Sequence, residues 1–432
     1  MYGLYSIFLF FSLLVYFPVY FVRSRILRRE SLRFRQRCGF SLKKKSSQSR
    51  SIWIHAVSVG EVLSLQNLIV QIKKKHPDWI VYFSCLTDTG FRLAKEKLIA
   101  VDDIFFVPLD FRLIVRKFFR HMKPDVFVLA ESEFWPNLLR EADRETKGVL
   151  LINGRISSRS FRRYQKIRFL MTRILSHISF FLVQTKRDKG MLEKIGIDSK
   201  VIQVAGNLKA EIKLPILEPS EMNELRGSIN IPEGAKVFVA GSVRKGEEEL
   251  LLKAFSCARE KNQELLLILA PRHPDRSNEV GKICQKYPFE VRKRSGVHRG
   301  TGWDVLILDT LGELAKFYAL SDVAFVGGSL VSWGGHNLLE PAYYAKPVFF
   351  GPHMDNFAHL AEIFVEAGAA RIVKNQADLV KMFSLWDEAE YQEMGQKAKS
   401  TLESLQGATE KTLKAIDSLM NIQKGDERDG DK

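Results

Sequence analysis

The stretch SIWIHAVSVGE, Ser51–Glu61, indicates the fold class of this chain. Its first seven residues are largely apolar and rich in β-branched and aromatic side chains, as expected for a strand that is covered on both faces. Ser58–Gly60 then end the strand, and Glu61 opens a helix-like segment that runs to residue 75. A strand that passes directly into a helix is half of a β-α-β unit, so this stretch predicts a parallel sheet.

The same alternation recurs along most of the chain. Further apolar runs, separated by helix-like segments, lie at 80–86, 104–110, 125–131, 148–154 and 180–185. A second set follows at 236–242, 265–271, 304–310, 322–328 and 347–352. Residues 207–234 lack a strand pattern and contain three prolines, which is typical of an interdomain connection.

These patterns predict an α/β protein with two doubly wound, Rossmann-like domains. A chain of 432 residues also exceeds the usual size of a single hydrophobic core. The predicted divisions are a membrane anchor at 1–22, a basic juxtamembrane segment at 23–50, a first domain at 51–206, a linker at 207–234, a second domain at 235–421 and a disordered tail at 422–432.

The N-terminus indicates a membrane protein. Residues 3–22 form an uncharged apolar run of about the length that a spanning helix needs. Residues 23–50 contain eleven Arg and Lys against one Glu, so +10 of the formal +16 lies there, and the positive-inside rule predicts that this flank is cytoplasmic. A cleaved signal peptide has its positive charge before the apolar run, so an anchor is favoured; a hydrophobic hairpin in one leaflet is an alternative. Because the charge excess lies beside the apolar run, membrane lipids are favoured over nucleic acid as partner.

Carboxylates follow two of the predicted strands. Glu61 stands in the first turn of a helix, where it either complements the helix dipole or serves as a general base. Glu131 and Glu133 follow the run at 125–131 directly. Because burial of an unpaired charge is costly, we expect one of them to contact Arg155 or Lys209.

The sequence disfavours the common nucleotide-binding loops. No GxGxxG follows a strand, and GSVRKGEE (241–248) has Glu247 where a phosphate loop needs its lysine. The loop could still offer backbone N–H groups and the Ser242 hydroxyl to a phosphate. The DxD pattern occurs only at 429–431 in the tail, so the sequence predicts no metal ion and no cofactor.

The stretch GGHNLLEP, Gly334–Pro341, has the composition of a ligand-binding helix start. Asn337 is a good N-cap, and with the N–H groups of Leu338 and Leu339 it predicts an anion site. Glu340 is either a capping-box partner or an acceptor of hydrogen bonds from paired sugar hydroxyls.

Several motifs together resemble those of the 3-deoxy-D-manno-octulosonic acid (Kdo) transferases of lipopolysaccharide assembly. They run in order from about residue 53 to residue 357 and include SVGE, ESEFWPNLL, NGRIS, GSVRKGEEE, APRHPDR, DTLGEL and FVGGSLVSWGGHNLLEPAYYAKPVFFGPHMDNF. This chain has Ser332 and Trp333 before the Gly-Gly pair, where family members often have a charged residue.

The resemblance implies a GT-B glycosyltransferase that moves Kdo from CMP-Kdo to the lipid A precursor, lipid IVA, with inversion, at the cytoplasmic face of the inner membrane. It implies that Glu61 is the general base and that Glu131 and Lys209 stabilise the transition state. The residues that it implies for binding CMP are Pro271, Arg272, Leu311, Gly312, Glu313, Asn337, Leu338, Leu339 and Glu340. A monophosphate leaving group also fits a site that has no metal ligands.

Two other functions remain open at this point. One is a GT-B transferase that uses another nucleotide sugar on a lipid acceptor, because Glu340 and the glycine pairs alone do not identify the sugar. The other is a catalytically inactive scaffold at a lipid surface. The joint presence of Glu61, Glu131 and Lys209 argues against the scaffold, which has no use for these residues.

Overall fold

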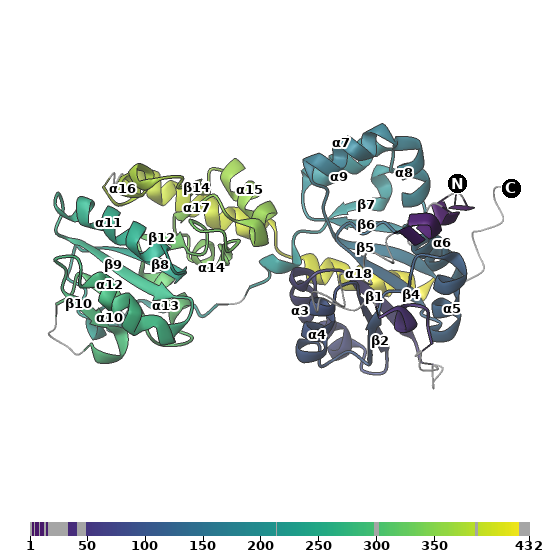
Figure 1. Ribbon diagram of the computed structural model, residues 1–432, viewed down its shortest axis with the longest axis horizontal. Helices are drawn as coiled ribbons and strands as arrows, with labels where there is room; N and C mark the ends of the chain where they lie inside the picture. Colours follow the sequence, from purple (N-terminus) through teal and green to yellow (C-terminus); the bar gives the residue numbers. More distant parts are fainter. Residues whose placement is uncertain are drawn as a thin grey trace. The chain divides into compact units, whose positions relative to one another are not determined.

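The computed structural model describes residues 2–3, 5–7, 9–12, 14–15, 33–40, 49–212, 214–297, 302–384 and 388–422 (Figure 1). The chain divides into two compact units, Met1–Glu211 with Leu405–Lys432, and Ile212–Ser404. Much of the predicted anchor and of the basic segment, and nearly all of the predicted tail, lie outside the described residues. Within the described ranges, no helix combines the length and apolar character needed to cross a bilayer.

The first unit contains a seven-stranded parallel sheet with the order β3-β2-β1-β4-β5-β6-β7. Its strands are β1 (Ser51–Ala56), β2 (Ile80–Cys85), β3 (Asp103–Phe106), β4 (Val126–Ala130), β5 (Gly148–Gly154), β6 (Phe180–Val183) and β7 (Ile202–Val204). Its helices are α2 (Phe34–Arg37), α3 (Val59–Lys75), α4 (Asp88–Lys97), α5 (Arg112–Met122), α6 (Pro136–Glu145), α7 (Ser158–Lys166), α8 (Arg168–Leu175), α9 (Lys186–Ile195) and α18 (Ala408–Asn421), with 3-10 turns η1 (Ser199–Val201) and η2 (Leu208–Ala210).

Both faces of this sheet are buried, as the continuous apolar runs predict. Ile52 and Ile54 of β1 pack in a core with side chains of α3 and α18, and Trp53 between them packs on the opposite face. There the Trp53 ring lies 4.6 Å from that of Phe119 on α5, measured between centroids, and 5.1 Å from that of Phe127 on β4. Alternate residues of one strand therefore contribute to two cores.

The second unit contains a parallel sheet with the order β10-β11-β9-β8-β12-β13-β14. Its strands are β8 (Lys236–Val243), β9 (Leu265–Pro271), β10 (Val291–Lys293), β11 (Val305–Ile307), β12 (Val323–Val326), β13 (Val348–Phe350) and β14 (Ala370–Ile372). Its helices are α10 (Pro219–Ser228), α11 (Glu247–Arg259), α12 (Ser277–Cys284), α13 (Leu314–Leu320), α14 (Leu339–Tyr343), α15 (Ala358–Glu366), α16 (Gln376–Ser384) and α17 (Glu388–Ser404), with 3-10 turns η3 (Pro274–Arg276), η4 (Arg294–Gly296) and η5 (Asp355–Phe357).

All eleven predicted strands are present, and three short strands were missed. The missed strands are β7, β10 and β14, which have three residues each and lie at sheet edges. Most of their residues are partly or fully exposed, so no continuous apolar run marks them. Burial on both faces, which makes a strand readable from sequence, is absent at an edge.

The domain boundaries differ from the sequence-based division. Much of the predicted linker, 207–234, is folded into the two units: η2 belongs to the first unit, and α10 packs its partly buried Met222 and Leu225 into the core of the second. The predicted second domain, 235–421, loses α18, because that helix packs against the sheet of the first unit beside α3 (yellow in Figure 1). An amphipathic helix carries no sequence signal for the sheet that it covers.

Candidate functional site

The predicted acidic residues of the first unit lie where the strand order reverses. Strands β1 and β4 are neighbours in the middle of the sheet, and the chain leaves β1 toward one edge and β4 toward the other. Ligands of doubly wound sheets bind beyond the carboxyl ends of the strands at such a point. Glu61 follows β1 and Glu131 follows β4, so both residues border this point.

Glu61 is held by the first turn of α3. Ser58 is the N-cap, and its Oγ accepts a hydrogen bond from the Glu61 amide at 3.3 Å. In return, the Glu61 carboxylate accepts hydrogen bonds from the Ser58 hydroxyl at 2.9 Å and from the Val57 amide at 2.8 Å. These reciprocal hydrogen bonds with the N-cap residue fix the position of the Glu61 carboxylate.

The environment of Glu61 also gives it the pKa of a general base. The side chain is buried, and burial raises its pKa to about 7, with a further contribution from the negative charge of Glu131. A base whose pKa lies near neutral pH is both ionised and able to accept a proton under ordinary conditions.

Glu131 is the carboxylate that pairs with the expected cations. Its backbone is left-handed, with a φ of 59°, and its side chain is buried at the carboxyl end of β4. Arg155 Nε lies 2.7 Å from one carboxylate oxygen, and Lys209 Nζ lies 3.9 Å from the other. The expected contact with Arg155 or Lys209 is thus confirmed for both cations. Burial raises the pKa of the neighbouring Glu133.

Lys209 connects this ion pair to the start of α3. A Cβ built on Gly60 would lie 3.5 Å from Lys209 Nζ, so the ammonium group lies against the first turn of that helix. The structure therefore brings Glu61, Glu131 and Lys209 together.

In the second unit, the predicted CMP residues lie in loops that follow several strands. Asn337 Oδ1 accepts a hydrogen bond from the Leu339 amide at 3.1 Å, and Asn337 Nδ2 donates to Glu340 Oε1 at 3.1 Å. Burial raises the pKa of Glu340, and the positive charge of Arg272 opposes the shift. Helix α14 begins at Leu339, two residues after the expected start, and the Leu339 amide is already engaged. The expected anion site therefore loses one of its two predicted backbone donors, the Leu339 amide.

The third predicted segment, Leu311–Glu313, is arranged differently. Leu311 is exposed and Gly312 has a φ of 81°, so this turn projects from the unit. Glu313 pairs with Arg294 at 3.4 Å. Among the described residues, no hydrogen bond or ion pair links Leu311–Glu313 to Arg272 or Asn337.

A cationic group beside the Arg272 loop was missed by the sequence analysis. Arg244 Nε donates to His336 Nε2 at 3.2 Å, its Nη1 lies 3.1 Å from His273 Nε2, and its guanidinium carbon lies 4.6 Å from the centroid of the Trp333 ring. Burial and the charges of Arg244 and Arg272 lower the pKa of His336 to about 4, so this imidazole is neutral at pH 7. The position of Arg244 after β8 was the available signal.

The structure argues against phosphate binding by the backbone amides of the 241–248 loop, which the sequence had left open. Glu247 is fully buried and accepts hydrogen bonds from the amides of Arg244, Gly328, Ser329 and Leu330 at 2.6–2.9 Å. The amide of Gly246 donates to Glu248. Acidic side chains of α11 thus occupy amides that a phosphate would need, and Glu247 joins this loop to residues 328–330.

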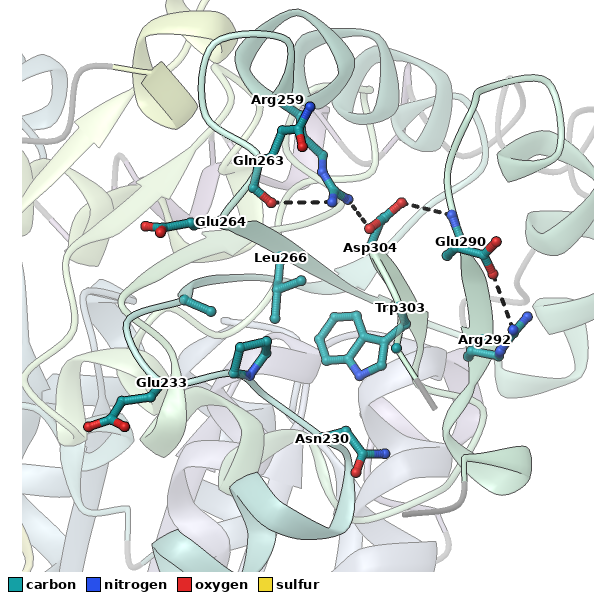
Figure 2. Close-up of a pocket in the computed structure, with 13 residues that line it drawn as sticks. Asn230, Glu233, Arg259, Gln263, Glu264, Leu266, Glu290, Arg292, Trp303 and Asp304 are labelled. Carbon is teal, nitrogen blue, oxygen red and sulfur yellow. Dashed lines mark hydrogen bonds and ion pairs between the residues drawn. The ribbon is translucent and has the colours of Figure 1, made fainter. Parts of the chain in front are cut away.

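A cavity of about 480 Å³ lies at the opposite end of the second sheet (Figure 2). Residues that immediately precede strands, such as Ala235, Glu264 and Asp304, line it, so it opens at the amino edge. Among its lining residues, Arg259 pairs with Asp304, and Arg292 pairs with Glu290 at 3.1 Å. Because ligands of these sheets bind at the carboxyl edge, the cavity is not the candidate site.

Comparisons with known proteins identify the family of the chain. The sequence pattern of the family described as 3-deoxy-D-manno-octulosonic-acid transferase (kdotransferase) matches residues 32–212. The chain is 31% identical over 363 residues to the 3-deoxy-D-manno-octulosonic acid transferase of Haemophilus influenzae, with 82% of this chain and 84% of that protein covered. The chain belongs to the Kdo transferase family. It is therefore a glycosyltransferase, as the motifs predict.

Other relatives of this Kdo transferase give further detail. This chain is 36% identical to a bifunctional glycosyltransferase/methyltransferase of Fusobacterium nucleatum, and the match covers 76% of this chain and about half (51%) of that protein. It is 32% identical to the C-terminal CMP-Kdo binding domain of WaaA from Acinetobacter baumannii over 43% of this chain and 97% of that domain, with a TM-score of 0.40. MurG of A. baumannii, 14% identical, covers 86% of this chain and 99% of its own with a TM-score of 0.54, which supports a GT-B-like fold.

Proposed function

We propose that this Kdo transferase moves Kdo from CMP-Kdo to lipid IVA with inversion, and that Glu61 is the general base. The observation that supports this most directly is the buried Glu61 carboxylate, whose pKa is raised to about 7 and which borders the Glu131–Lys209 pair. A scaffold without catalytic activity would not need a carboxylate held in this state.

The reaction is a single displacement. The acceptor hydroxyl gives its proton to the Glu61 carboxylate while its oxygen bonds to the anomeric carbon of Kdo. The bond from that carbon to the CMP phosphate oxygen breaks, and CMP leaves with the electron pair. Attack opposite to the leaving group inverts the anomeric centre, and no cofactor takes part.

Lys209 supplies positive charge close to the base. Both the Kdo carboxylate and the departing phosphate are anionic, so a fixed ammonium group stabilises the charge that develops as the bond breaks. Glu131 holds this ammonium from one side, and Arg155 completes the charge balance of the cluster.

The second unit is proposed to bind CMP. Pro271 ends β9 and Arg272 follows it, and Glu340 offers a partly buried carboxylate to the ribose hydroxyls with Asn337 beside it. The remaining contacts are assigned to Leu311, Gly312, Glu313, Leu338 and Leu339. A GT-B transferase that uses another nucleotide sugar would share this site geometry, so the identity of the sugar rests on family membership.

The N-terminal segment is proposed to bind the cytoplasmic face of the inner membrane. Residues 2–3, 5–7, 9–12 and 14–15 are helical, and Tyr2 and Ser6 contact the first unit through His177 and Asn137. The side chains on the other face are apolar and more than half exposed; they are Ile7, Phe10, Phe11, Leu14 and Val15. This spacing of i, i+3, i+4, i+7 and i+8 presents one apolar stripe, which suits contact with lipid.

The proposal is tested with purified, detergent-solubilised protein, CMP-Kdo and tetraacyl lipid A precursor. Product mass and CMP release are measured beside the Glu61→Gln variant. We expect transfer by the wild type and a loss of at least about 100-fold in the variant. Wild-type protein that is folded but releases no CMP would reject the donor assignment and favour another nucleotide sugar.

A further inference from the structure

We propose that Gln184 is a positioning residue for catalysis, which fixes Lys209 relative to Glu131 by joining the carboxyl end of β5 to the turn at 207–209. This inference rests on the role of Lys209 in the proposed function. The proposed reaction requires the Lys209 ammonium group at a fixed position beside Glu131. Buried, uncharged side chains contact the turn that carries Lys209.

Gln184 directly follows β6 and is 2% exposed. Its Nε2 donates a hydrogen bond to the backbone carbonyl of Asn153 at 3.0 Å. Its Oε1 accepts a hydrogen bond from Asn207 Nδ2 at 3.0 Å. One side-chain amide therefore bridges the carboxyl end of β5 and the turn that follows β7.

Each of the two segments leads to one of the cations that contact Glu131. Asn153 of β5, which has a left-handed φ of 51°, lies two residues before Arg155. Asn207 lies two residues before Lys209, and its Oδ1 accepts a hydrogen bond from the Lys209 amide at 2.9 Å. Asn153 Oδ1 accepts from the Leu208 amide at 3.1 Å, which is a second link between β5 and the turn.

The three side-chain amides are costly to bury, and they bond to one another and to backbone groups of the two segments, while Asn153 Nδ2 has no hydrogen-bond partner. Asn153, Gln184 and Asn207 are each no more than 3% exposed. The sheet itself does not need them, because backbone pairing already joins β5 to β6 and β6 to β7. Apolar side chains would serve the core at a lower desolvation cost. The three amides lie close in the chain to Arg155 and Lys209, and we attribute their presence to the positioning of these two cations.

The consequence is geometric. A displacement of a catalytic group by about 1 Å can cost about 100-fold in rate. Loss of the Gln184 bridge removes one of the two links between Asn153 and the 207–209 turn and leaves the bond from the Leu208 amide, so Lys209 is held less precisely relative to Glu131. The CMP residues lie in the other unit and share no contact with Gln184 in the described part of the chain.

The test uses the full chain with Gln184→Met, which keeps the side-chain length and removes both hydrogen bonds. We expect kcat to fall about 10- to 100-fold with an unchanged KM for CMP-Kdo. The matched control is Thr146→Val. The Thr146 hydroxyl is buried near the amino end of β5, whereas Gln184 contacts its carboxyl end, and it donates a hydrogen bond to the Ala142 carbonyl at 2.7 Å. The control should lower the thermal midpoint and leave kcat unchanged.

A double-mutant cycle separates positioning from a general loss of stability. In a Lys209→Ala background, Gln184→Met should change kcat by less than about twofold, because the group that it positions is gone. The inference would be overturned if the fold-reductions in kcat of Gln184→Met and Lys209→Ala multiplied in the double variant. A folded Gln184→Met variant with wild-type kcat would also overturn it. If Lys209→Ala itself keeps full activity, the proposed role of Lys209 fails, and the inference fails with it. Should Gln184→Met not fold, Gln184→Glu removes only the bond donated to Asn153, and a fall in kcat is again expected.

Discussion

At the scale of single residues, the proposed role of Glu61 and its burial favour opposite charge states. The proposed base must be ionised, whereas its buried position favours the protonated form. Because its pKa is about 7, we predict that kcat/KM for transfer rises with pH and levels off above an apparent pKa near 7. A pH–rate profile measures this. Glu133→Gln is the control, and it should retain the rate; a flat profile between pH 5.5 and 8.5 would exclude Glu61 as the titrating base.

The same pKa shift makes a prediction for stability. The folded-state pKa of Glu61 lies above the ordinary glutamate value of 4.5. The stabilising contribution of Glu61 to the free energy of unfolding is therefore complete below pH 4.5 and is lost as the pH rises through about 7. Glu61→Gln should therefore stabilise the protein relative to the wild type at pH 8, by up to about 3 kcal/mol, and much less at pH 4.5. Denaturant unfolding at the two pH values measures the difference. Equal effects at both would contradict the shift.

Sequence alone identified the charged residues of the site but not the amides that hold them. Glu61 and Glu131 follow predicted strands and occur in the quoted motifs, so position and residue type pointed to both. Lys209 lies in the predicted linker and was selected as a possible partner of an acidic residue and through the family resemblance. Gln184 and Asn207 are single amides in unremarkable stretches, and their role depends on contacts between strands that only the folded sheet creates. Arg244 was missed because its loop was compared only with a phosphate-binding pattern.

At the scale of elements, α18 is the segment whose place could not be predicted. Its Leu419 is 1% exposed, and a Cβ built on Gly148 of β5 would lie only 2.6 Å from Leu419 Cδ2. The helix thus packs directly against the amino end of the strand that leads to Asn153 and Arg155. The assignment of this segment to the second domain was wrong.

This packing predicts a stability effect in the first unit. Leu419→Ala should reduce the free energy of unfolding by about 2–5 kcal/mol, because it removes buried contacts and leaves a cavity. Ser418→Ala on the same helix is the control, since the Ser418 hydroxyl is exposed and bonds only to the Lys414 carbonyl. Denaturant titration of both variants measures the effect. A change below about 1 kcal/mol in Leu419→Ala would mean that α18 is not part of the core.

At the scale of the whole molecule, the chemistry is divided between two units that each have their own sheet and core. The proposed base and its ion pair belong to the first unit, and the proposed CMP residues belong to the second. A ligand that contacts only the second unit stabilises that unit by mass action, by about 2.7 kcal/mol at 100 times its Kd. Binding of CMP and positioning of the base are therefore separable in the intact protein.

Hydrogen exchange on the full chain can measure this separation. We predict that CMP slows exchange at amides around Arg272 and Leu339 and leaves those of β4 and β5 unchanged. Glu61→Gln should show the same CMP effect as the wild type, because its carboxylate lies in the other unit. Arg272→Ala should weaken the effect, since a cation beside Glu340 is lost. If CMP slowed exchange mainly at amides around Glu131 and Lys209, the nucleotide would bind to the first unit, which would contradict the assignment of CMP binding to the second.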